Sequence, residues 1–285
     1  MLWFALGLAL LLYVGLLLLL RLNEGRLLYF PGDSRVLAAP DLGTELPLER
    51  VEIHTADSIT LVAWALKPVR DDARWLLICH GNAGNISDPA RVRQYGALRE
   101  LGVGILAFDY RGYGESGGTP SEPGLYRDAE AAYRYLRDRG VPPERLVLFG
   151  HSLGSAVAVE LAGRVPAAGL ILEGALTSVV DRAQEIYRWV PVRWIAISRF
   201  GSLERVARLT LPKLFLHAAA DDVVPLSHGR RLYQAAPGPK VFVELRGGHG
   251  DAFEVDSARY FGAIAGFLAG LPAAPADGLA PRTPF

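Results

Sequence analysis

One stretch, Arg145 to Arg164, constrains the fold of this 285-residue chain more than any other. A buried-strand pattern, Leu146 to Phe149, runs directly into Gly-His-Ser-Leu-Gly at 150–154, and a helix rich in small residues follows. This order is the sequence form of a nucleophile elbow, in which a tight turn presents a serine hydroxyl. Ser152 is therefore the candidate nucleophile.

The glycines on either side of Ser152 have a steric cause. A turn this tight brings the residues two before and two after the serine together, where a Cβ atom would clash, and Gly150 and Gly154 lack that atom. The helix after the turn points its free backbone N–H groups and the positive end of its dipole toward the serine. We therefore expect the N–H group of Leu153 to stabilise the oxyanion that develops during acyl transfer.

A second Gly-x-Ser-x-Gly pattern occurs at 114–118, with Ser116 at its centre. Thr119 and Pro120 follow it in place of a helix, and no apolar run leads into it. Such a motif counts only in its strand-turn-helix context. We interpret this copy as a flexible loop and Ser116 as non-catalytic.

Charge and cysteine content argue against several classes of function. The chain has 30 basic and 30 acidic residues, so its net charge is zero and no global field attracts nucleic acid. The single cysteine, Cys79, excludes an intrachain disulfide and a cysteine-rich metal site. Cys79 lies in an apolar run, which predicts a small buried core residue. The histidines lack ligand spacing, so no metal or other cofactor is implied.

The N-terminal run from Leu2 to Leu20 carries no charge, and about 20 apolar helical residues are what a bilayer core requires. No basic residue precedes the run, it is longer than the apolar part of a signal peptide, and no cleavage pattern follows. We therefore predict an uncleaved membrane anchor at 1–21. The arginines at 21, 26 and 35 weakly favour a cytoplasmic location for the catalytic domain.

Beyond the anchor, the sequence predicts a single α/β domain over 48–270. Two short β patterns at 50–54 and 59–66 indicate an antiparallel hairpin at a sheet edge. From Trp75 onward, short apolar runs alternate with helical segments, which is typical of a mostly parallel sheet with helices on both faces. In one such helix, at about 120–139, Thr119, Pro120 and Glu122 are predicted as N-cap, first residue and capping-box partner, and Gly140 ends it.

Three further segments depart from the alternating pattern. Residues 22–47 contain Pro and Gly without sustained periodicity and are predicted to form a juxtamembrane connection. Residues 271–285 are predicted to be a disordered tail. Between them, 177–208 holds an aromatic-rich stretch that includes Trp189 and Trp194. It either adds one or two helices packed on the sheet, or forms a lid whose aromatic face meets an acyl chain or the membrane interface.

A serine hydroxyl is a weak nucleophile, so Ser152 needs a base to take its proton and an acid to orient that base. In an elbow architecture the chain order is Ser, then Asp or Glu, then His. His249 lies in a glycine-rich loop directly after the last predicted strand and is the candidate base. His217, at the end of a strand, is interpreted as a satisfied core residue, and His228 as the start of a surface helix.

The acid is expected after the strand that ends at His217, where both Asp221 and Asp222 occur. Asp221 is our choice, with Asp222 as a helix cap or solvated neighbour, although spacing alone does not separate the two. Glu173, after the preceding strand, is a rival candidate.

The second oxyanion donor is expected in the loop after the first parallel strand, His80 to Asn85. Two glycines there let backbone N–H groups approach a substrate, so Asn82 is the candidate donor and Ala83 the alternative. A tight turn with His80 as structural support is the other interpretation. Asn85 begins a formal glycosylation motif that we treat as coincidental.

Five motifs taken together carry a family resemblance. They are HGNAGN at 80–85, FDYRGYGESGG at 108–118, GHSLGSAVA at 150–158, the HxxxDxxVP spacing at 217–225 and the histidine loop at 247–251. With these motifs the chain resembles the membrane-anchored α/β-hydrolases of the serine aminopeptidase-like (S33-type) group, which includes depalmitoylase-like and lysophospholipase-like members. The resemblance covers roughly 48–270, implies the fold and the triad, and favours Asp221 over Asp222. Ala218 is a departure, because the family usually has glycine there.

The expected activity is hydrolysis of a carboxylic ester or thioester through an acyl-enzyme on Ser152. The expected partners are a small-molecule or lipid-like acyl substrate and a membrane, with no nucleic acid. One alternative is a peptidase that releases N-terminal residues, for which Glu173, Asp181 and Glu185 could supply an acidic cluster. The other is a non-catalytic, membrane-tethered binding protein with the same fold.

Overall fold

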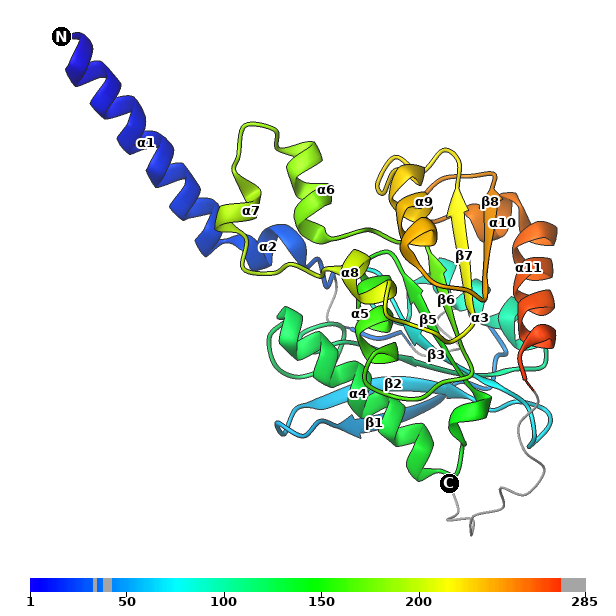
Figure 1. The fold of residues 1–285 in the computed structure, drawn as a ribbon. Coiled ribbons are helices and arrows are strands. Elements are labelled where there is room, and N and C mark those ends of the chain that lie inside the picture. The colour runs from blue at the N-terminus through cyan, green and yellow to red at the C-terminus, as the bar shows by residue number, and fades with distance from the viewer. Residues whose placement is uncertain (33–34, 38–42, 273–285) are drawn as a thin grey trace.

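The computed structural model describes residues 1–32, 35–37 and 43–272, and in them an eight-stranded sheet is covered by helices on both faces (Figure 1). The strands are β1 Glu49–His54, β2 Thr60–Leu66, β3 Trp75–Cys79, β4 Gly104–Phe108, β5 Leu146–His151, β6 Gly169–Glu173, β7 Lys213–Ala218 and β8 Lys240–Leu245. They lie in the order β1-β2-β4-β3-β5-β6-β7-β8.

The sheet has one antiparallel corner and is otherwise parallel. β1 and β2 form the predicted hairpin at the sheet edge, and β2 is also antiparallel to β4. Every other neighbouring pair, from β4 through β8, is parallel. The carboxyl ends of the parallel strands therefore meet at one edge, where ligands bind in open α/β sheets. The predicted fold class is confirmed.

The helices divide into two layers and a set of peripheral elements. Their bounds are α1 Leu2–Leu22, α2 Glu24–Leu28, α3 Pro89–Glu100, α4 Glu122–Asp138, α5 Leu153–Ala162, α6 Val179–Ile186, α7 Val192–Ile195, α8 Ser202–Val206, α9 Leu226–Ala235, α10 Ala252–Val255 and α11 Ser257–Gly270. Side chains of α4, α5, α8 and α9 pack on one face of the sheet, and those of α3, α10 and α11 pack on the other. The two apolar cores enclose β5, which carries the serine turn.

The predicted cap of α4 is wrong by two residues. Ser121, in extended conformation, is the N-cap, and its Oγ accepts a hydrogen bond from the N–H of Gly124 at 3.2 Å. Thr119 and Pro120 therefore lie outside the helix, and Glu122 is its first residue. Gly140 follows the helix with φ of 82°, the left-handed conformation expected of glycine there.

The N-terminal helix α1 projects away from the rest of the molecule (Figure 1). It has a mean hydropathy of 2.5 and no buried residue, so it is long and apolar enough to cross a membrane. The connection after it is partly ordered against the domain: Tyr29 is buried, and Phe30 forms a bridge with Ala83. Residues 33–34 and 38–42 of this connection, and 273–285 of the predicted tail, lie outside the described residues.

Candidate active site

Ser152 sits at the turn between β5 and α5, with φ of 52° and ψ of −121°. Such a backbone conformation costs a non-glycine residue on the order of 1–3 kcal/mol, so the surrounding structure must hold it. The N–H of Ser152 donates to the carbonyl of Glu173 at 2.9 Å, and the carbonyl of Ser152 accepts from the N–H of Ser155 at 2.9 Å. The hydroxyl is therefore presented at the carboxyl edge of the sheet.

The flanking glycines let two pieces of backbone pack against the turn. A Cβ on Gly150 would lie 2.5 Å from the carbonyl oxygen of Gly154, which is the mutual contact expected from the sequence. A Cβ on Gly154 would instead overlap the carbonyl oxygens of Cys79 and His80, at the end of β3. Gly154 thus lets α5 press against the neighbouring strand, a contact that only the tertiary structure reveals.

His249, in the loop after β8, links the serine to an aspartate. Its Nε2 lies 2.8 Å from Ser152 Oγ, and its Nδ1 lies 2.7 Å from Asp221 Oδ2. Gly174 leaves space for the ring, because a Cβ there would lie 3.1 Å from His249 Cε1. The three residues come from loops after β5, β7 and β8 and form one chain of hydrogen bonds.

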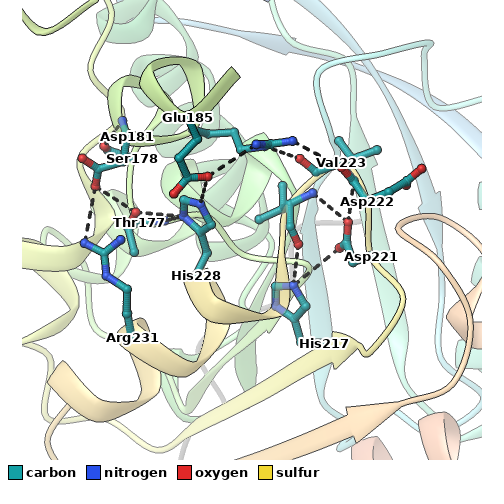
Figure 2. Close-up of polar contacts among 12 residues, drawn as sticks. Thr177, Ser178, Asp181, Glu185, His217, Asp221, Asp222, Val223, His228 and Arg231 are labelled. Carbon is teal, nitrogen blue, oxygen red and sulfur yellow. Dashed lines mark hydrogen bonds and ion pairs between the residues drawn. The ribbon is translucent and has the colours of Figure 1, made fainter. Parts of the chain in front are cut away.

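Asp221 is buried at the end of β7 and holds its charge through several partners (Figure 2). Its Oδ1 accepts from the N–H groups of Val223 at 3.0 Å and Val224 at 2.7 Å. Burial by itself raises the pKa of Asp221, but the hydrogen bond and charge of His249, with the Val224 N–H, outweigh it and lower the pKa below its usual value. Asp221 is therefore ionised and favours a proton on His249 Nδ1.

The rival acids lie elsewhere. Asp222 is exposed, and Figure 2 shows its carboxylate turned away from Asp221. Glu173 is buried on the other side of the elbow, where its Oε2 accepts from Gln94 at 3.2 Å. Burial raises the pKa of Glu173 to about 7, and the hydrogen bonds of Tyr260 and Gln94 only partly oppose this. Neither carboxylate has a hydrogen bond to His249 among the residues that the structure describes.

The loop that carries Asn82 packs directly on the elbow. A Cβ on Gly81 would lie 3.4 Å from Ser152 Cβ, so the residue directly before Asn82 is close to the serine. The carbonyl of Asn82 accepts from Phe30 N–H and from Tyr113 Oη, each at 2.9 Å, and its side chain donates to Leu28 at 2.9 Å. These bonds fix the loop and involve other atoms than the Asn82 N–H.

The alternative residues all have structural partners. Ser116 is buried, accepts from Val62 N–H and donates to the carbonyl of Asp109, so its loop is held in place where we predicted flexibility. His217 is buried, as expected of a core residue, with Nε2 2.8 Å from the carbonyl of Val224. His228 is also fully buried, which contradicts its interpretation as a surface residue.

His228 is buried because the 177–208 segment covers it (Figure 2). Its Nε2 lies 3.0 Å from Glu185 Oε2 on α6, and its Nδ1 lies 2.9 Å from Thr177 Oγ1. These partners precede His228 by 43 and 51 residues. A helical pattern around His228 cannot reveal cover supplied from so far away in the chain.

Two residues that contact the site were not singled out from the sequence. His151 Nε2 lies 3.1 Å from the carbonyl oxygen of His249, and burial and the adjacent His249 lower the pKa of His151 to about 3, so a neutral ring donates this bond. Arg182 on α6 donates to the carbonyls of Val223 at 2.5 Å and Asp222 at 3.2 Å, next to Asp221. The sequence could have pointed to His151, because it directly precedes Ser152. No feature of the sequence pointed to Arg182.

Comparison with known proteins places the chain in a family. The family profile described as "Serine aminopeptidase, S33" matches residues 70–203, which include the Asn82 loop and the elbow and end before Asp221. An uncharacterized protein of Mycobacterium tuberculosis is 38% identical over 258 residues, covering 89% of this chain and 90% of that protein. That match extends almost end to end.

Two vertebrate relatives match a smaller share of the chain. Lysophosphatidylserine lipase ABHD12 of Danio rerio is 38% identical over 191 residues, 61% of this chain and 50% of that protein. Alpha/beta hydrolase domain-containing protein 17C of Xenopus laevis is 36% identical over 163 residues, 57% of this chain and 51% of that protein. This chain therefore spans only about half the length of either relative.

Solved structures share the fold. An esterase of Pyrococcus furiosus superposes with a TM-score of 0.71 at 18% identity, covering 86% of this chain and 99% of that chain. An esterase domain from Rhodothermus marinus superposes with a TM-score of 0.59 at 23% identity, covering 78% and 97%. Together with the sheet order, the profile match and the near full-length relative, this shows that the chain belongs to the serine aminopeptidase (S33) family of α/β-hydrolases.

Proposed function

We propose that this serine hydrolase cleaves carboxylic esters of lipid-like substrates, with Ser152 as nucleophile, His249 as base and Asp221 as the residue that orients His249. One observation carries the proposal: the hydrogen-bond chain from Ser152 Oγ to His249 Nε2 at 2.8 Å and from His249 Nδ1 to Asp221 Oδ2 at 2.7 Å. Because Asp221 is ionised, Nδ1 keeps its proton and Nε2 is free to accept the proton of the serine.

In the proposed reaction Ser152 Oγ attacks the ester carbonyl while its proton passes to His249 Nε2. The N–H groups of Leu153 and Asn82 hold the oxyanion of the tetrahedral intermediate. The bond between the acyl carbon and the alcohol oxygen then breaks, and the alcohol leaves with the proton from Nε2. Water attacks the acyl-enzyme, gives its proton to His249 and releases the acid, after which Ser152 regains its proton.

The choice of a lipid-like substrate rests on two supports. The relative from Danio rerio is named a lysophosphatidylserine lipase, and α1 is apolar enough to hold the enzyme at a membrane. A thioester would follow the same steps with a thiol as the leaving group. Ester cleavage is the first choice because the relative's name refers to a lipid ester.

The peptidase alternative fits less well, because the acidic groups that could bind an amine already have partners. Asp181 lies 2.9 Å from Thr177 Oγ1 and 3.1 Å from Arg193, and Glu185 contacts His228 and Arg182. Glu173 is buried, with its pKa raised to about 7. An incoming ammonium group would have to displace these partners, which opposes a peptidase that needs a free N-terminus.

A fluorophosphonate probe tests the catalytic proposal and the non-catalytic alternative together. Wild-type protein should be labelled and Ser152→Ala should not, while the two melt at similar temperatures. Ser116→Ala is the matched control, because Ser116 lies at the centre of the other Gly-x-Ser-x-Gly pattern, and it should keep full labelling. Equal labelling of wild type and Ser152→Ala would end the proposal.

Substrate class is tested separately. A series of p-nitrophenyl esters of increasing acyl length, measured beside aminoacyl p-nitroanilides, should show hydrolysis of the esters alone. A preference for the anilides would replace the esterase proposal with the peptidase.

A further inference from the structure

Five large apolar side chains of the 177–208 segment are more than half exposed. Ile186, Tyr187 and Ile197 are 53%, 54% and 62% exposed, and Trp189 and Trp194 are 91% and 88% exposed. We call these five residues the aromatic face. Exposure of such large apolar side chains to water is unfavourable, and a contiguous group of them marks a binding surface.

The backbone of the 177–208 segment lies alongside α1, and three residues of the N-terminal region hold it there. Tyr13 Oη donates to the carbonyl of Trp189 at 2.8 Å, and Arg21 donates to the carbonyl of Ile195 at 2.7 Å. Figure 1 shows α7 next to the end of α1 that meets the domain. Because Tyr13 and Arg21 are about 12 Å apart along the helix axis, the segment follows the last turns of α1 toward its middle.

Glu24 continues this contact just beyond the apolar run. Its carboxylate accepts from the N–H groups of Ile197 at 2.6 Å and Ser198 at 2.7 Å. The charged residues Arg21 and Glu24 therefore contact the segment where α1 ends. Tyr13 contacts it nearer the middle of α1. A bilayer crossed by α1 would bring headgroups to Arg21 and Glu24 and acyl chains to Tyr13.

The Tyr13 contact suits a nonpolar surrounding. A hydroxyl in the middle of an apolar helix has no partner in hydrocarbon, and neither has the carbonyl of an irregular segment at the same depth. Tyr13 and Trp189 satisfy one another. Tryptophan and tyrosine side chains also prefer the interfacial zone of membranes, where an apolar ring can be buried and a polar edge stays hydrated.

We propose that the aromatic face is a second membrane-binding surface, which inserts into the leaflet of phospholipid that surrounds the domain-proximal half of α1. A bilayer is the occupant because the face continues the exposed apolar surface of α1, which a lipid must cover if that helix spans. A second protein on the same face would have to share it with that lipid. The inference goes beyond ester hydrolysis and does not require Ser152 to be catalytic.

The aromatic face is linked to the active site, because α6 belongs to the same 177–208 segment. Arg182 on α6 donates to the carbonyls of Asp222 and Val223, which follow Asp221 in the chain. Insertion of the aromatic face would therefore fix α6 and the loop of Asp221 relative to the bilayer. Esters with a bilayer-embedded acyl chain would be presented to an enzyme already oriented toward them.

Tryptophan fluorescence tests the proposal without any activity measurement. The chain has five tryptophans, of which Trp64 and Trp75 are buried and Trp3 lies in α1. Full-length Trp3→Phe protein would be reconstituted into phosphatidylcholine nanodiscs with and without acyl-chain-brominated phosphatidylcholine, a contact quencher.

We expect brominated discs to reduce the emission of the Trp3→Phe protein. The loss should disappear when Trp189→Phe and Trp194→Phe are added, because only the two core tryptophans then remain. Equal emission in the two kinds of disc would overturn the proposal. Equal emission together with a blue-shifted spectrum would identify a protein, such as a second copy, as the occupant.

A second test uses hydrolysis. Trp189→Ser and Trp194→Ser should each slow cleavage of a long-chain ester embedded in the disc by about tenfold and leave cleavage of a soluble short-chain ester unchanged. Val69→Ser is the control, because Val69 is 81% exposed in the connection between β2 and β3, outside the 177–208 segment, and it should change neither rate. Equal losses on both esters would contradict the proposal. If wild-type protein cleaves neither ester, the proposed ester hydrolysis fails. The quenching experiment then still decides whether the aromatic face inserts into the bilayer.

Discussion

The two halves of the candidate site are held in place by different physics. The elbow half is one continuous segment, in which Gly150 packs against Gly154, Gly154 packs against the end of β3, and the Ser152 N–H bonds to the carbonyl of Glu173 on β6. The acid-base half joins two loops, and its residues Asp221 and His249 are 28 positions apart. Side-chain hydrogen bonds, including one set from α6, hold these loops.

The difference teaches where the site can tolerate change. Steric packing at the elbow has no graded response, because an added atom meets backbone that cannot move. Hydrogen-bonded loops can lose one partner and shift slightly. We therefore expect substitutions at the elbow to affect folding. Substitutions around Asp221 should affect catalysis, and the loss should be smaller the farther the residue lies from His249.

The largest effect is expected from Gly154→Ala. The new Cβ would overlap the carbonyl oxygens of Cys79 and His80, so the protein should lose more than about 4 kcal/mol of stability or fail to fold. Gly262→Ala is the matched control, because Gly262 also lies inside a helix but has no atom within 4 Å of an added Cβ. It should be neutral or stabilise by up to about 1 kcal/mol in chemical denaturation. A well-folded Gly154→Ala protein would contradict the steric account.

Asp221→Asn should leave the fold intact and reduce kcat on a p-nitrophenyl ester by on the order of 10⁴-fold, because an amide no longer enforces the correct tautomer of His249. Asp222→Asn, one residue away and exposed, should stay within about twofold of wild type. Similar losses in both variants would remove the distinction between Asp221 and Asp222.

Glu173 is the last residue of β6, and its carbonyl accepts from the N–H of Ser152. Its buried carboxyl should make the free energy of unfolding depend on pH. Its pKa is about 7 when folded and about 4.5 when unfolded, so the folded state holds more protons between these values and stability falls as pH rises through that window. The total change is about 3 kcal/mol. Glu173→Gln should flatten this part of the curve and be more stable than wild type at pH 8, as measured by urea denaturation. An unchanged pH profile would show that the carboxyl is ionised when folded.

Arg182→Gln should have the smallest of these effects, a loss of about tenfold in kcat with little change in KM or melting temperature, because the loop of Asp221 loses an outside support. A double-mutant cycle separates positioning from general damage. In an Asp221→Asn background the Arg182 change should have almost no further effect. Arg193→Gln, on the same segment but paired with Asp181, is the control and should behave as wild type. Full additivity would argue against a positioning role.

The features that the sequence predicted correctly are those whose physical causes lie within a few neighbouring residues. The strand, turn and helix around Ser152 are adjacent in sequence, so their pattern indicated the elbow directly. His249 was predicted from chain order, and Asp221 was chosen over Asp222 with the support of the family resemblance. The structure places His249 within hydrogen-bond reach of both Ser152 and Asp221. The N-cap of α4 was misplaced because Thr119 and Ser121 offer equivalent hydroxyls, and only the path of the chain selects between them.

His228 and Arg182 mark the limit of this reasoning. The burial of His228 depends on Glu185 and Thr177, and the role of Arg182 depends on carbonyls about 40 residues later. No periodicity records such contacts, because they involve side chains and backbone groups that meet only after the segment at 177–208 folds over the loops. The same holds for the contact between Tyr13 and Trp189, which are separated by 176 residues.

The sequence by itself determined the sheet with its two helical layers, the apolar N-terminal helix and the strand-turn-helix that presents the candidate nucleophile, because each depends on hydrophobic spacing or on steric demands within a few residues. Tertiary structure alone decided how the 177–208 segment bonds to both α1 and the loop of Asp221, and that Gly154 must lack a side chain where it packs against the end of β3. The physical reason is that hydrogen bonds and close packing act over a few ångströms in space, and sequence distance carries no record of that proximity.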